Sequence, residues 1–492
     1  MTSLTILTLP LIPLAAGAVL SVAVGRTAGR RGGSIAGLVA VIALSIAFLQ
    51  LLALSYPPGG PERTMGLGET QLRADGLGVY LGLIATGLGV AVAVYSLAAE
   101  RRAHGRPAYA SLLLLLVAGI VGIGLSGDLF NLFVFFELMA LSSYALVAFH
   151  RDAMEAVEAG MKYLVMSAAG SLLALLGIGF LYLATGTLDL DLLAQTRLDS
   201  GTAAVAASLL IAGFGVKAAV VPLHTWLPDA HAAAPSGISA MLSGVVIQAG
   251  LIAMVRSLAV FGVGGTSAIS VGILLALLGV VSMTVGNLTA MHQKDVKRML
   301  AYSSVAQMGY ILLGVGVGLE YAIPLALAGA LFHVLSHALM KGGAFLAAGA
   351  LQGAWGTRDL DGLRGTGRRL PLAGVPFAIF AVGLAGAPPM VGFPSKLFIA
   401  SGSAQAGGWL GVFFVVALVA NSVLSLSYYV PAISLLFSKA EGQTEPRHVV
   451  GRGFLVPIVA MAVLAILFGL WPAPILAAVE PAVRSILGGG PP

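Results

Sequence analysis

Apolar segments long enough to cross a bilayer recur along the chain, and they constrain its fold more than any other feature. A helix needs about 20 apolar residues to cross the hydrocarbon core of a membrane. About fourteen segments meet this criterion, starting near Leu4, Ser34, Leu77, Ala108, Leu129, Lys162, Thr202, Ile238, Ser267, Leu300, Ile323, Leu370, Trp409 and Leu455. Only 9% of the 492 residues are charged, against about 25% in soluble domains. The sequence therefore predicts an all-α polytopic membrane protein with little mass outside the bilayer.

Positively charged residues indicate how these segments are oriented. When about fourteen spans are drawn, the basic clusters fall on one side, which the positive-inside rule identifies as cytoplasmic. The opposite connections, such as residues 185–201, are poorer in basic residues. The basic clusters are Arg26/Arg30/Arg31, Arg101/Arg102/Arg106, Arg151, Lys294/Lys297/Arg298, Arg358/Arg364/Arg368/Arg369 and Lys439/Arg447/Arg452. We therefore expect a prokaryotic inner-membrane protein with both termini on the outer, periplasmic side.

Composition excludes several other classes of protein and site. The chain has no cysteine, which excludes thiolate metal sites, iron–sulfur clusters and disulfides. Its net charge of +6 forms no basic stripe, so we expect no nucleic-acid partner. The longest polar segments, residues 55–76 and 352–369, are too short for a soluble catalytic domain and are expected to be loops. We expect no cofactor in this chain.

A single carboxylate lies near the middle of one spanning segment. Residues 127–149 are apolar almost throughout and carry Glu137 at bilayer depth. An ionised group at the centre of a spanning helix costs roughly 2.5–3.5 kcal/mol, so such residues usually face a bundle interior or a water path and mark a function. The alternative is a neutral, hydrogen-bonded glutamic acid that only packs helices together.

Two further charges lie beside predicted breaks in helices. Lys217 precedes Pro222 by five residues, and a proline inside a helix frees a backbone carbonyl one turn earlier. Lys396 follows Pro388, Pro389 and Pro394 in a second interrupted segment. Substrate and ion sites of transporters are commonly built on such interrupted helices, although each could also be an ordinary kink with a lysine that reaches the interface.

Histidines form the third candidate feature. His333, His337 and Lys341 are spaced by four residues and therefore share one helical face. A metal pair and a hydrogen-bonded core pair both remain alternatives, but we expect no metal because no third ligand is adjacent. We favour a hydrated proton relay, since histidine titrates near neutral pH. The side chains of His224, Asp229 and His231 follow Pro222, where capping and loop solvation are the expected roles.

With these residues identified, the sequence resembles the antiporter-like membrane subunits of Mrp sodium/proton antiporters, respiratory complex I and membrane-bound hydrogenases. The greatest similarity is to the D subunit of Mrp antiporters. The resemblance rests on four strings in this order: GDLFNLFVFFELMALSSYAL, KAAVVPLHTWLPDAHAAAPSGISAMLSG, MHQKDVKRMLAYSSVAQMGYILLG and LSHALMKGGAFL.

The resemblance implies two inverted five-helix repeats, each with one broken helix. We expect N-terminal helices in residues 1–107, the first repeat in residues 108–260, the second in residues 261–436, and a loop and last helix in residues 437–492. The resemblance assigns Glu137 and Lys217 as the charged pair of the first half and Lys396 as the lysine of the second. It places His333 and His337 near a central relay, to which we add Lys341.

One position departs from the family pattern. Where the family usually has a lysine, this chain has Gln248. A glutamine cannot carry a mobile proton. The resemblance implies a line of polar groups along the middle of the membrane. At Gln248 this line is either completed by water and histidines or interrupted.

These features favour a proton-translocating subunit of a multisubunit monovalent cation (Na⁺)/proton antiporter, which is a transporter and not an enzyme. The alternative is a proton-pumping membrane subunit of a redox complex such as an NADH:quinone oxidoreductase or a membrane-bound hydrogenase. A silent scaffold is disfavoured because buried charges are costly for an anchor. The expected partners are other membrane subunits, protons, Na⁺ and the lipid bilayer.

Overall fold

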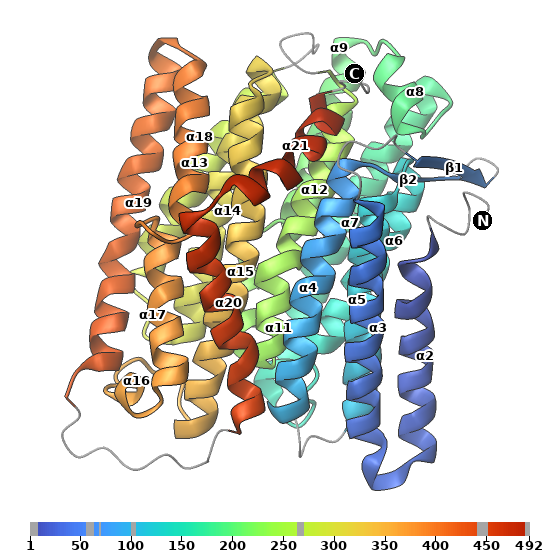
Figure 1. The fold of residues 1–492 in the computed structure, drawn as a ribbon. Helices are drawn as coiled ribbons and strands as arrows, with labels where there is room; N and C mark the ends of the chain where they lie inside the picture. Colours follow the sequence, from blue (N-terminus) through green and yellow to red (C-terminus); the bar gives the residue numbers. More distant parts are fainter. Residues whose placement is uncertain are drawn as a thin grey trace.

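Long helices run side by side through the whole chain in a computed structural model (Figure 1). The structure describes residues 8–55, 63–67, 70–99, 105–262, 270–439 and 451–487. Its elements are α2 (Leu11–Thr27), η1 (Gly29–Arg31), α3 (Gly32–Leu54), β1 (Arg63–Leu67), β2 (Thr70–Ala74), α4 (Gly76–Ala99), α5 (Arg106–Leu125), α6 (Leu129–Val147), α7 (Met154–Thr185), α8 (Leu190–Gln195), α9 (Ser200–Lys217), α10 (Trp226–Ala233), α11 (Ser236–Met241), η2 (Leu242–Val246), α12 (Ile247–Ala259), α13 (Val271–Ala290), α14 (Val296–Tyr321), α15 (Pro324–Trp355), α16 (Thr366–Arg369), α17 (Pro371–Ala385), α18 (Gly392–Gln405), α19 (Gly408–Phe437), α20 (Arg452–Leu470) and α21 (Ala473–Leu487).

The predicted all-α membrane architecture is confirmed. Within the described residues, 12 helices are long and apolar enough to cross a membrane, and α2 and α17 are shorter apolar helices. Together they correspond to the segments expected from the sequence. The segment near Ile238 is divided into α11, the π-helical turn η2 and α12, and the segment near Leu370 into α17 and α18.

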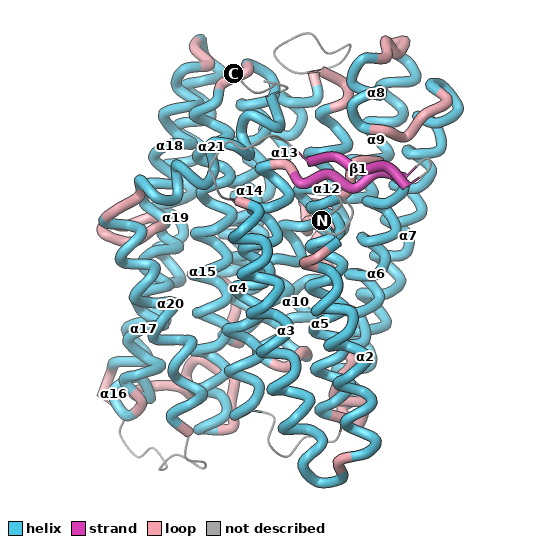
Figure 2. The backbone as a smooth tube through the Cα atoms, turned by 45° about the vertical axis from the view of Figure 1, so that its right-hand side comes forward, coloured by secondary structure: helices cyan, strands magenta, loops and turns pink. Residues whose placement is uncertain are grey.

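The polar connections are more ordered than the sequence predicts. Residues 55–76, expected as a loop, contain an antiparallel hairpin of β1 and β2 (Figure 2). The backbone N–H of Gly127 donates to Gln71 O, which fixes the hairpin to the turn between α5 and α6. The second expected loop includes the end of α15 and the short helix α16. Outside the bilayer, backbone groups still need partners, and these short elements supply them.

Two helices are broken where the prolines predict. Helix α9 ends at Lys217, and an irregular turn with a cis Val221–Pro222 bond leads to α10. Helix α17 ends before Gly386, whose φ of 92° lies in the left-handed region, and a turn with a cis Pro388–Pro389 bond leads to α18. Backbone carbonyls are left outside the helical ladder at each break.

The packing of one five-helix block recurs in the other. Helix α5 packs on α6 and α7 on α9, while α13 packs on α14 and α15 on α17. Because five spans are an odd number, the second block enters the membrane from the opposite side, which makes the two blocks inverted relative to each other. The fifth span of the first block, formed by α11, η2 and α12, contains an 18-residue stretch that is wholly buried.

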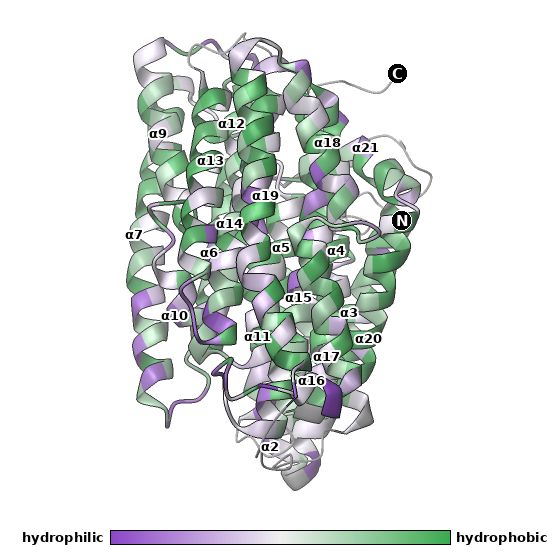
Figure 3. Cartoon of the chain, turned by 90° about the vertical axis from the view of Figure 1, so that its left-hand side faces the viewer, coloured by the Kyte–Doolittle hydropathy of each residue, from purple (hydrophilic) through white to green (hydrophobic). Residues whose placement is uncertain are grey.

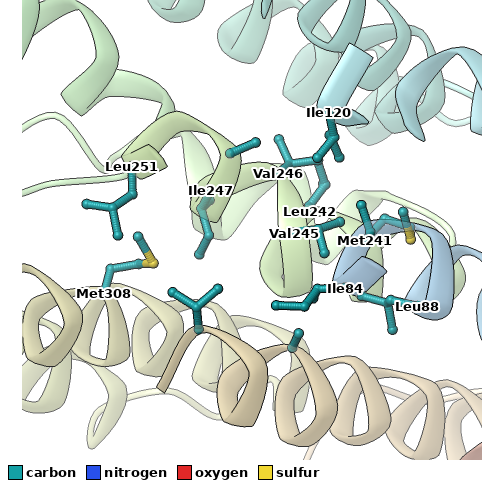
Figure 4. Close-up of a cluster of buried hydrophobic side chains, with 14 of the residues drawn as sticks. Ile84, Leu88, Ile120, Met241, Leu242, Val245, Val246, Ile247, Leu251 and Met308 are labelled. Carbon is teal, nitrogen blue, oxygen red and sulfur yellow. The ribbon is translucent and has the colours of Figure 1, made fainter. Parts of the chain in front are cut away.

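The centre of the bundle is largely apolar. Figure 4 shows Met241 and Val245 beside Ile84 and Leu88 of α4, with Met308 of α14 near the start of α12. All five side chains are at most 6% exposed. Charged side chains buried in this region must therefore be hydrogen-bonded to, or paired with, other groups of the protein.

The two ends of the bundle differ in charge. The turn between α2 and α3 and the short helix α16 lie at the lower end in Figure 1, which we name the basic end, and the hairpin lies toward the other end. Of the expected basic clusters, Arg101, Arg102 and Arg447 lie outside the described residues. One residue assigned to a basic loop does not belong there: Lys297 is 2% exposed in the first turn of α14 and donates to Ala234 O at 2.7 Å. Which compartment the basic end faces stays a prediction.

Candidate functional site

Glu137 of α6 and Lys217 of α9 do not form a direct ion pair in the described structure. Glu137 is half-buried and accepts a hydrogen bond from Ser171 of α7. Lys217 is 1% exposed, and its Nζ donates to the hydroxyl of Tyr163 at 3.0 Å. The ammonium also lies 4.7 Å from the ring centroid of Tyr144. Lys217 is therefore held by a phenol and by aromatic faces, with the carboxylate farther away.

The partners of Lys217 are fixed by the break in α9. Ser143 Oγ donates to the Tyr163 hydroxyl at 2.9 Å, and the Tyr163 ring stacks on Trp226 with centroids 4.0 Å apart. The indole Nε1 of Trp226 donates to Val216 O at 2.8 Å, next to the end of the helix. Neither Tyr163 nor Trp226 was predicted as a site residue from the sequence, although Trp226 lies in the string KAAVVPLHTWLPDAH that begins at Lys217.

Helix α12 approaches the broken helix closely. A Cβ added to Gly250 would lie 2.9 Å from Ala218 N and 3.0 Å from Lys217 Cβ. Glycine is required for such a close approach of a helix to a neighbouring backbone. This contact brings the segment that carries Gln248 beside the segment that carries Lys217.

Gln248 connects α12 to α15, the helix that carries His333 and His337. Its Nε2 lies 2.8 Å from Val334 O and 2.8 Å from His337 Nδ1. An amide nitrogen has two protons to donate, so His337 Nδ1 is the acceptor and its proton is on Nε2. His337 Nε2 and Gln248 Oε1 are buried without a hydrogen-bond partner among the described residues. These free polar atoms are suited to bound water.

His333 continues the path into the second half. Its Nε2 lies 2.9 Å from Gln307 Oε1, and its Nδ1 lies 2.8 Å from Ser395 Oγ. The amide of Gln307 donates to Leu384 O at 3.0 Å. Lys396 Nζ donates to the same carbonyl at 2.9 Å, at the break after α17. The chain of contacts from His333 to Lys396 is therefore continuous.

Lys341 lies beside this path and is fully buried. Its Nζ donates to Leu300 O at 2.7 Å and to Ser303 Oγ. The hydroxyl of Ser303 is hydrogen-bonded to Tyr429 of α19. Lys341 therefore leads to hydroxyl groups of α14 and α19, one helical turn from His337.

The prediction of loop solvation was wrong for His231. This residue is 0% exposed on α10, its ring stacks on Phe345 at 4.6 Å, and neither ring nitrogen has a partner among the described residues. Asp229 lies on the same helix and accepts from Arg298 at 2.6 Å and from Lys162 at 3.3 Å. Partial burial raises the pKa of Asp229, but these hydrogen bonds and charges outweigh it and hold the pKa below its ordinary value.

His224 was also expected to be solvated in the turn after Pro222. It is only 9% exposed, and its ring lies edge-on to Tyr302 with centroids 6.3 Å apart. The turn between α9 and α10 packs between helices, and this packing buries His224.

The described residues contain no group of three or more histidine and carboxylate side chains placed to bind a metal ion. His333 and His337 instead bind protein groups through their Nδ1 atoms, Ser395 and Gln248 respectively. A neutral imidazole can accept a proton at one nitrogen and release it from the other. The arrangement is therefore suited to proton transfer between Lys217, the histidines and Lys396.

Comparison with known proteins identifies relatives that cover most of the chain. The family model described as NADH:quinone oxidoreductase/Mrp antiporter, transmembrane, matches residues 126–424. The N subunit of the NADH-quinone oxidoreductase of Desulforudis audaxviator is 36% identical over 422 residues, which cover 80% of this chain and 82% of that protein. The D subunit of the Na⁺/H⁺ antiporter of Bacillus subtilis is 34% identical over 412 residues, which cover 82% of this chain and 81% of that protein.

Solved structures share the complete fold. A chain of the archaeal membrane-bound sulfane sulfur reductase superposes with a TM-score of 0.84 at 31% identity, covering 99% of this chain and 97% of that chain. A chain of the Mrp complex from Dietzia sp. DQ12-45-1b superposes with a TM-score of 0.85 at 25% identity, covering 99% and 98%. The protein therefore belongs to the NADH:quinone oxidoreductase/Mrp antiporter family of multispan membrane subunits.

Proposed function

We propose that this chain moves protons across the membrane as one subunit of a multisubunit monovalent cation/proton antiporter. The observation that carries the proposal is a series of buried polar groups within the bundle. Gln248 is hydrogen-bonded to His337, and His333 is connected to Lys396 through Gln307 and Leu384 O. We infer that water completes the remaining intervals, from Glu137 to Lys217, from Lys217 to Gln248 and from His337 to His333. A membrane protein that only anchored its partners would gain nothing from burying these groups.

The separation of Glu137 from Lys217 supplies a coupling mechanism. A carboxylate close to a buried ammonium favours its charged form, and a distant one favours proton release. When Glu137 moves toward Lys217, the lysine holds its proton, and when it moves away, the proton passes to the central groups. A change of charge outside the chain that displaces Glu137 would thereby drive proton movement.

The second half provides the exit for the proton. Lys396 Nζ donates to the carbonyls of Leu384 and Ala385, at 2.9 and 3.3 Å, and not to a carboxylate. Its ammonium lies 4.0 Å from the ring centroid of Tyr310. Because no described carboxylate forms an ion pair with Lys396, its proton can leave without stranding an opposite charge in the core.

Lysine substitutions test the proposal. Lys217→Ala and Lys396→Ala should each abolish cation/proton exchange in membrane vesicles, and so should Glu137→Ala, while the complex still assembles. Lys294→Ala is the control: it removes the same side chain from an exposed position and should leave exchange unchanged. Normal exchange in any of the three assembled path variants would remove that residue from the mechanism.

A second candidate function is proton pumping in the membrane arm of a redox complex. It is favoured by the 36% identity to an NADH-quinone oxidoreductase subunit and the 31% identity to a chain of a sulfane sulfur reductase. Purification from the native membrane in mild detergent, followed by mass spectrometry, separates the two. Recovery with membrane subunits alone supports antiport, and recovery with iron–sulfur, nickel or flavin subunits supports the redox pump.

A further inference from the structure

Helices α3, α4 and α5 pack on one another (Figure 1) and leave a hollow between them near the basic end. About 340 Å³ of this hollow is not filled by protein atoms. Most of its wall is made of small and aliphatic side chains, such as Ala40 of α3, Ala93 of α4 and Leu113 of α5. From Arg106 to Leu113 it extends for about two helical turns, or ~10 Å, toward the middle of the bundle.

Arg106 lies at the mouth of the hollow. Its guanidinium donates to Ser34 Oγ at 3.3 Å and to Leu97 O at 3.4 Å, so it spans the mouth from α3 to α4. Both distances are long for N–H···O hydrogen bonds, which cluster near 2.9–3.0 Å. A phosphate group accepts two parallel hydrogen bonds from a guanidinium and binds it more strongly than a neutral oxygen does. The mouth of the hollow is therefore suited to a phosphate.

The sequence around this mouth is basic. The connection between α2 and α3 and the connection between α4 and α5 together contain six arginines and one acidic residue, Glu100. Anionic headgroups attract basic residues that lie next to the ends of spanning helices. Charge at this corner of the bundle therefore favours an anionic headgroup over a zwitterionic one. The six arginines are Arg26, Arg30, Arg31, Arg101, Arg102 and Arg106.

Apolar surface continues from the hollow along the outer side of α3. Leu38 and Ile42 are 52% and 50% exposed, and the exposed Ser34 lies one turn nearer the basic end. A phospholipid has the same order of chemistry, with a phosphate at the interface and acyl chains toward the middle of the bilayer. A helix with its side chains is about 10 Å wide, which is too wide for a hollow enclosed by three packed helices. A single acyl chain is narrower and can enter it.

We propose that the hollow between α3, α4 and α5 binds one anionic phospholipid. Arg106 holds the phosphate, one acyl chain enters the hollow beside Ala40 and Ala93, and the other chain lies on the exposed side of α3. The bound lipid fills space that the protein leaves empty and strengthens the attachment of α3 to α4 and α5. This inference concerns the attachment of the N-terminal helices and does not depend on proton transfer.

Photochemical cross-linking in the complete complex tests the proposal. The complex is reconstituted in phosphatidylcholine vesicles with a small fraction of phosphatidylglycerol that carries a diazirine in the middle of one acyl chain. A parallel sample carries the same chain on phosphatidylcholine, and mass spectrometry locates the cross-links. We expect phosphatidylglycerol to label the residues around the hollow about fivefold more than phosphatidylcholine does. The exposed side of α7 around Leu172, which is 67% exposed, should be labelled equally by both lipids.

Three variants identify what binds the lipid. Arg106→Gln should remove the preference for phosphatidylglycerol at the hollow, because the phosphate loses its guanidinium. Arg26→Gln is the matched control, since it removes an exposed arginine from the same end of the bundle and should keep most of the preference. Ala93→Leu fills the hollow and should lower labelling there with either headgroup, while Arg106 stays in place.

Several results would overturn the proposal. Equal labelling around the hollow by the two lipids would indicate an ordinary lipid belt, and equal losses in Arg106→Gln and Arg26→Gln would indicate attraction to surface charge alone. Unchanged labelling in assembled Ala93→Leu would place the acyl chain outside the hollow. Absence of labelling there in the complete complex would mean that a neighbouring subunit covers it. If Ala93→Leu does not assemble, the comparison of headgroups on the unchanged complex still decides.

Discussion

The buried lysines share one kind of environment. Lys297, Lys341 and Lys396 each donate to a backbone carbonyl, at 2.7, 2.7 and 2.9 Å. Lys217 donates to a phenol. The hydrogen-bond acceptors identified for these four ammonium groups are therefore neutral oxygens. When a buried ion pair loses one charge, the other is stranded at a cost of several kcal/mol. A lysine of the path held by neutral oxygens avoids that cost, which makes its protonation reversible.

Gln248 is the position where a titratable group is missing, and the first prediction concerns its replacement. A lysine at this position can donate to the same two acceptors, Val334 O and His337 Nδ1, that Gln248 uses. We therefore expect Gln248→Lys to assemble and to carry protons with a shifted pH optimum, because a titrating group now lies in the path. The pH profile of exchange in vesicles measures this. An unchanged profile would mean that protons pass without using position 248.

Asp229 gives a pH-dependent prediction outside the spanning segments. Its pKa is lowered in the folded protein, so its ion pairs contribute stability above the unfolded-state pKa of about 3.9 and lose it as the pH falls through the folded value. Asp229→Asn lacks this contribution, which for partly exposed pairs is about 1 kcal/mol or less. The difference in Tm between the two proteins should be greatest above pH ~4 and vanish on further acidification. Asp361→Asn, with a side chain 70% exposed, is the control, and a difference that grows on acidification would contradict the assignment.

At the scale of elements, the breaks in α9 and α17 matter more than the length of any helix. At the break after α17, Leu384 O accepts a hydrogen bond from Lys396. At the break after α9, Val216 O accepts one from the indole of Trp226. A continuous helix would use those carbonyls internally. The prolines therefore create acceptors at bilayer depth as well as turns.

Gly386 allows a test of one break. An added Cβ there would lie 2.9 Å from Lys396 Cδ at a φ of 92°, whereas Gly186, with a φ of 71°, has no atom within 4 Å of its added Cβ. Both Gly386→Ala and Gly186→Ala should lose roughly 1–2 kcal/mol of stability from backbone strain. Only Gly386→Ala should slow proton transfer, because only it displaces Lys396. Equal transfer rates in the two assembled variants would show that the position of Lys396 is not critical.

Sequence patterns predicted the spanning helices because bilayer thickness fixes their length and composition, and they predicted the breaks because proline cannot continue a helix. The same rules did not predict the hairpin or α8 and α10, since short polar segments carry no periodic signal strong enough to identify them. The burial of His231 and Lys297 also escaped prediction. Their sequence neighbours are polar, and only the packing of α10 against α14 and α15 buries them.

At the scale of the whole molecule, hydrophobic residues extend along most of the length of the helices, and hydrophilic residues occur mainly near the ends of the bundle and in short stretches within it (Figure 3). At the end opposite the basic end, the buried carboxylate of Asp75 is paired with Arg256 and also with Arg73, whose Nε lies 3.5 Å from Asp75 Oδ2. Arg256 of α12 donates to Asp75 at 2.5 Å and to Gly124 O at 2.7 Å, and both side chains of the pair are at most 5% exposed. This pair joins the start of α4 and the end of α5 to the helix that carries Gln248.

The last prediction concerns the pair of Arg256 and Asp75. Arg256→Leu should lower the stability of the complex by less than the ~3–5 kcal/mol of a buried charge left without any partner, because the Asp75 carboxylate keeps Arg73, 3.5 Å away, as its remaining charged partner. Asp75→Asn combined with Arg256→Leu should recover part of the loss, since the incompletely compensated charge is then removed. Arg484→Leu breaks an exposed pair with Glu480, whose side chains are 52% and 62% exposed, and should change stability by about 0.5 kcal/mol or less.

Thermal unfolding of the purified complex, followed with all three variants in the same detergent, measures these differences. If Arg256→Leu were no less stable than Arg484→Leu, the pair would not hold α12 in place. If the double variant were as unstable as Arg256→Leu, the loss would come from the freed carbonyls of Gly124 and Ser126, to which Arg256 donates, and not from the charge of Asp75. Recovery in the double variant would instead identify charge compensation as the reason why the N-terminal helices remain docked on the central unit.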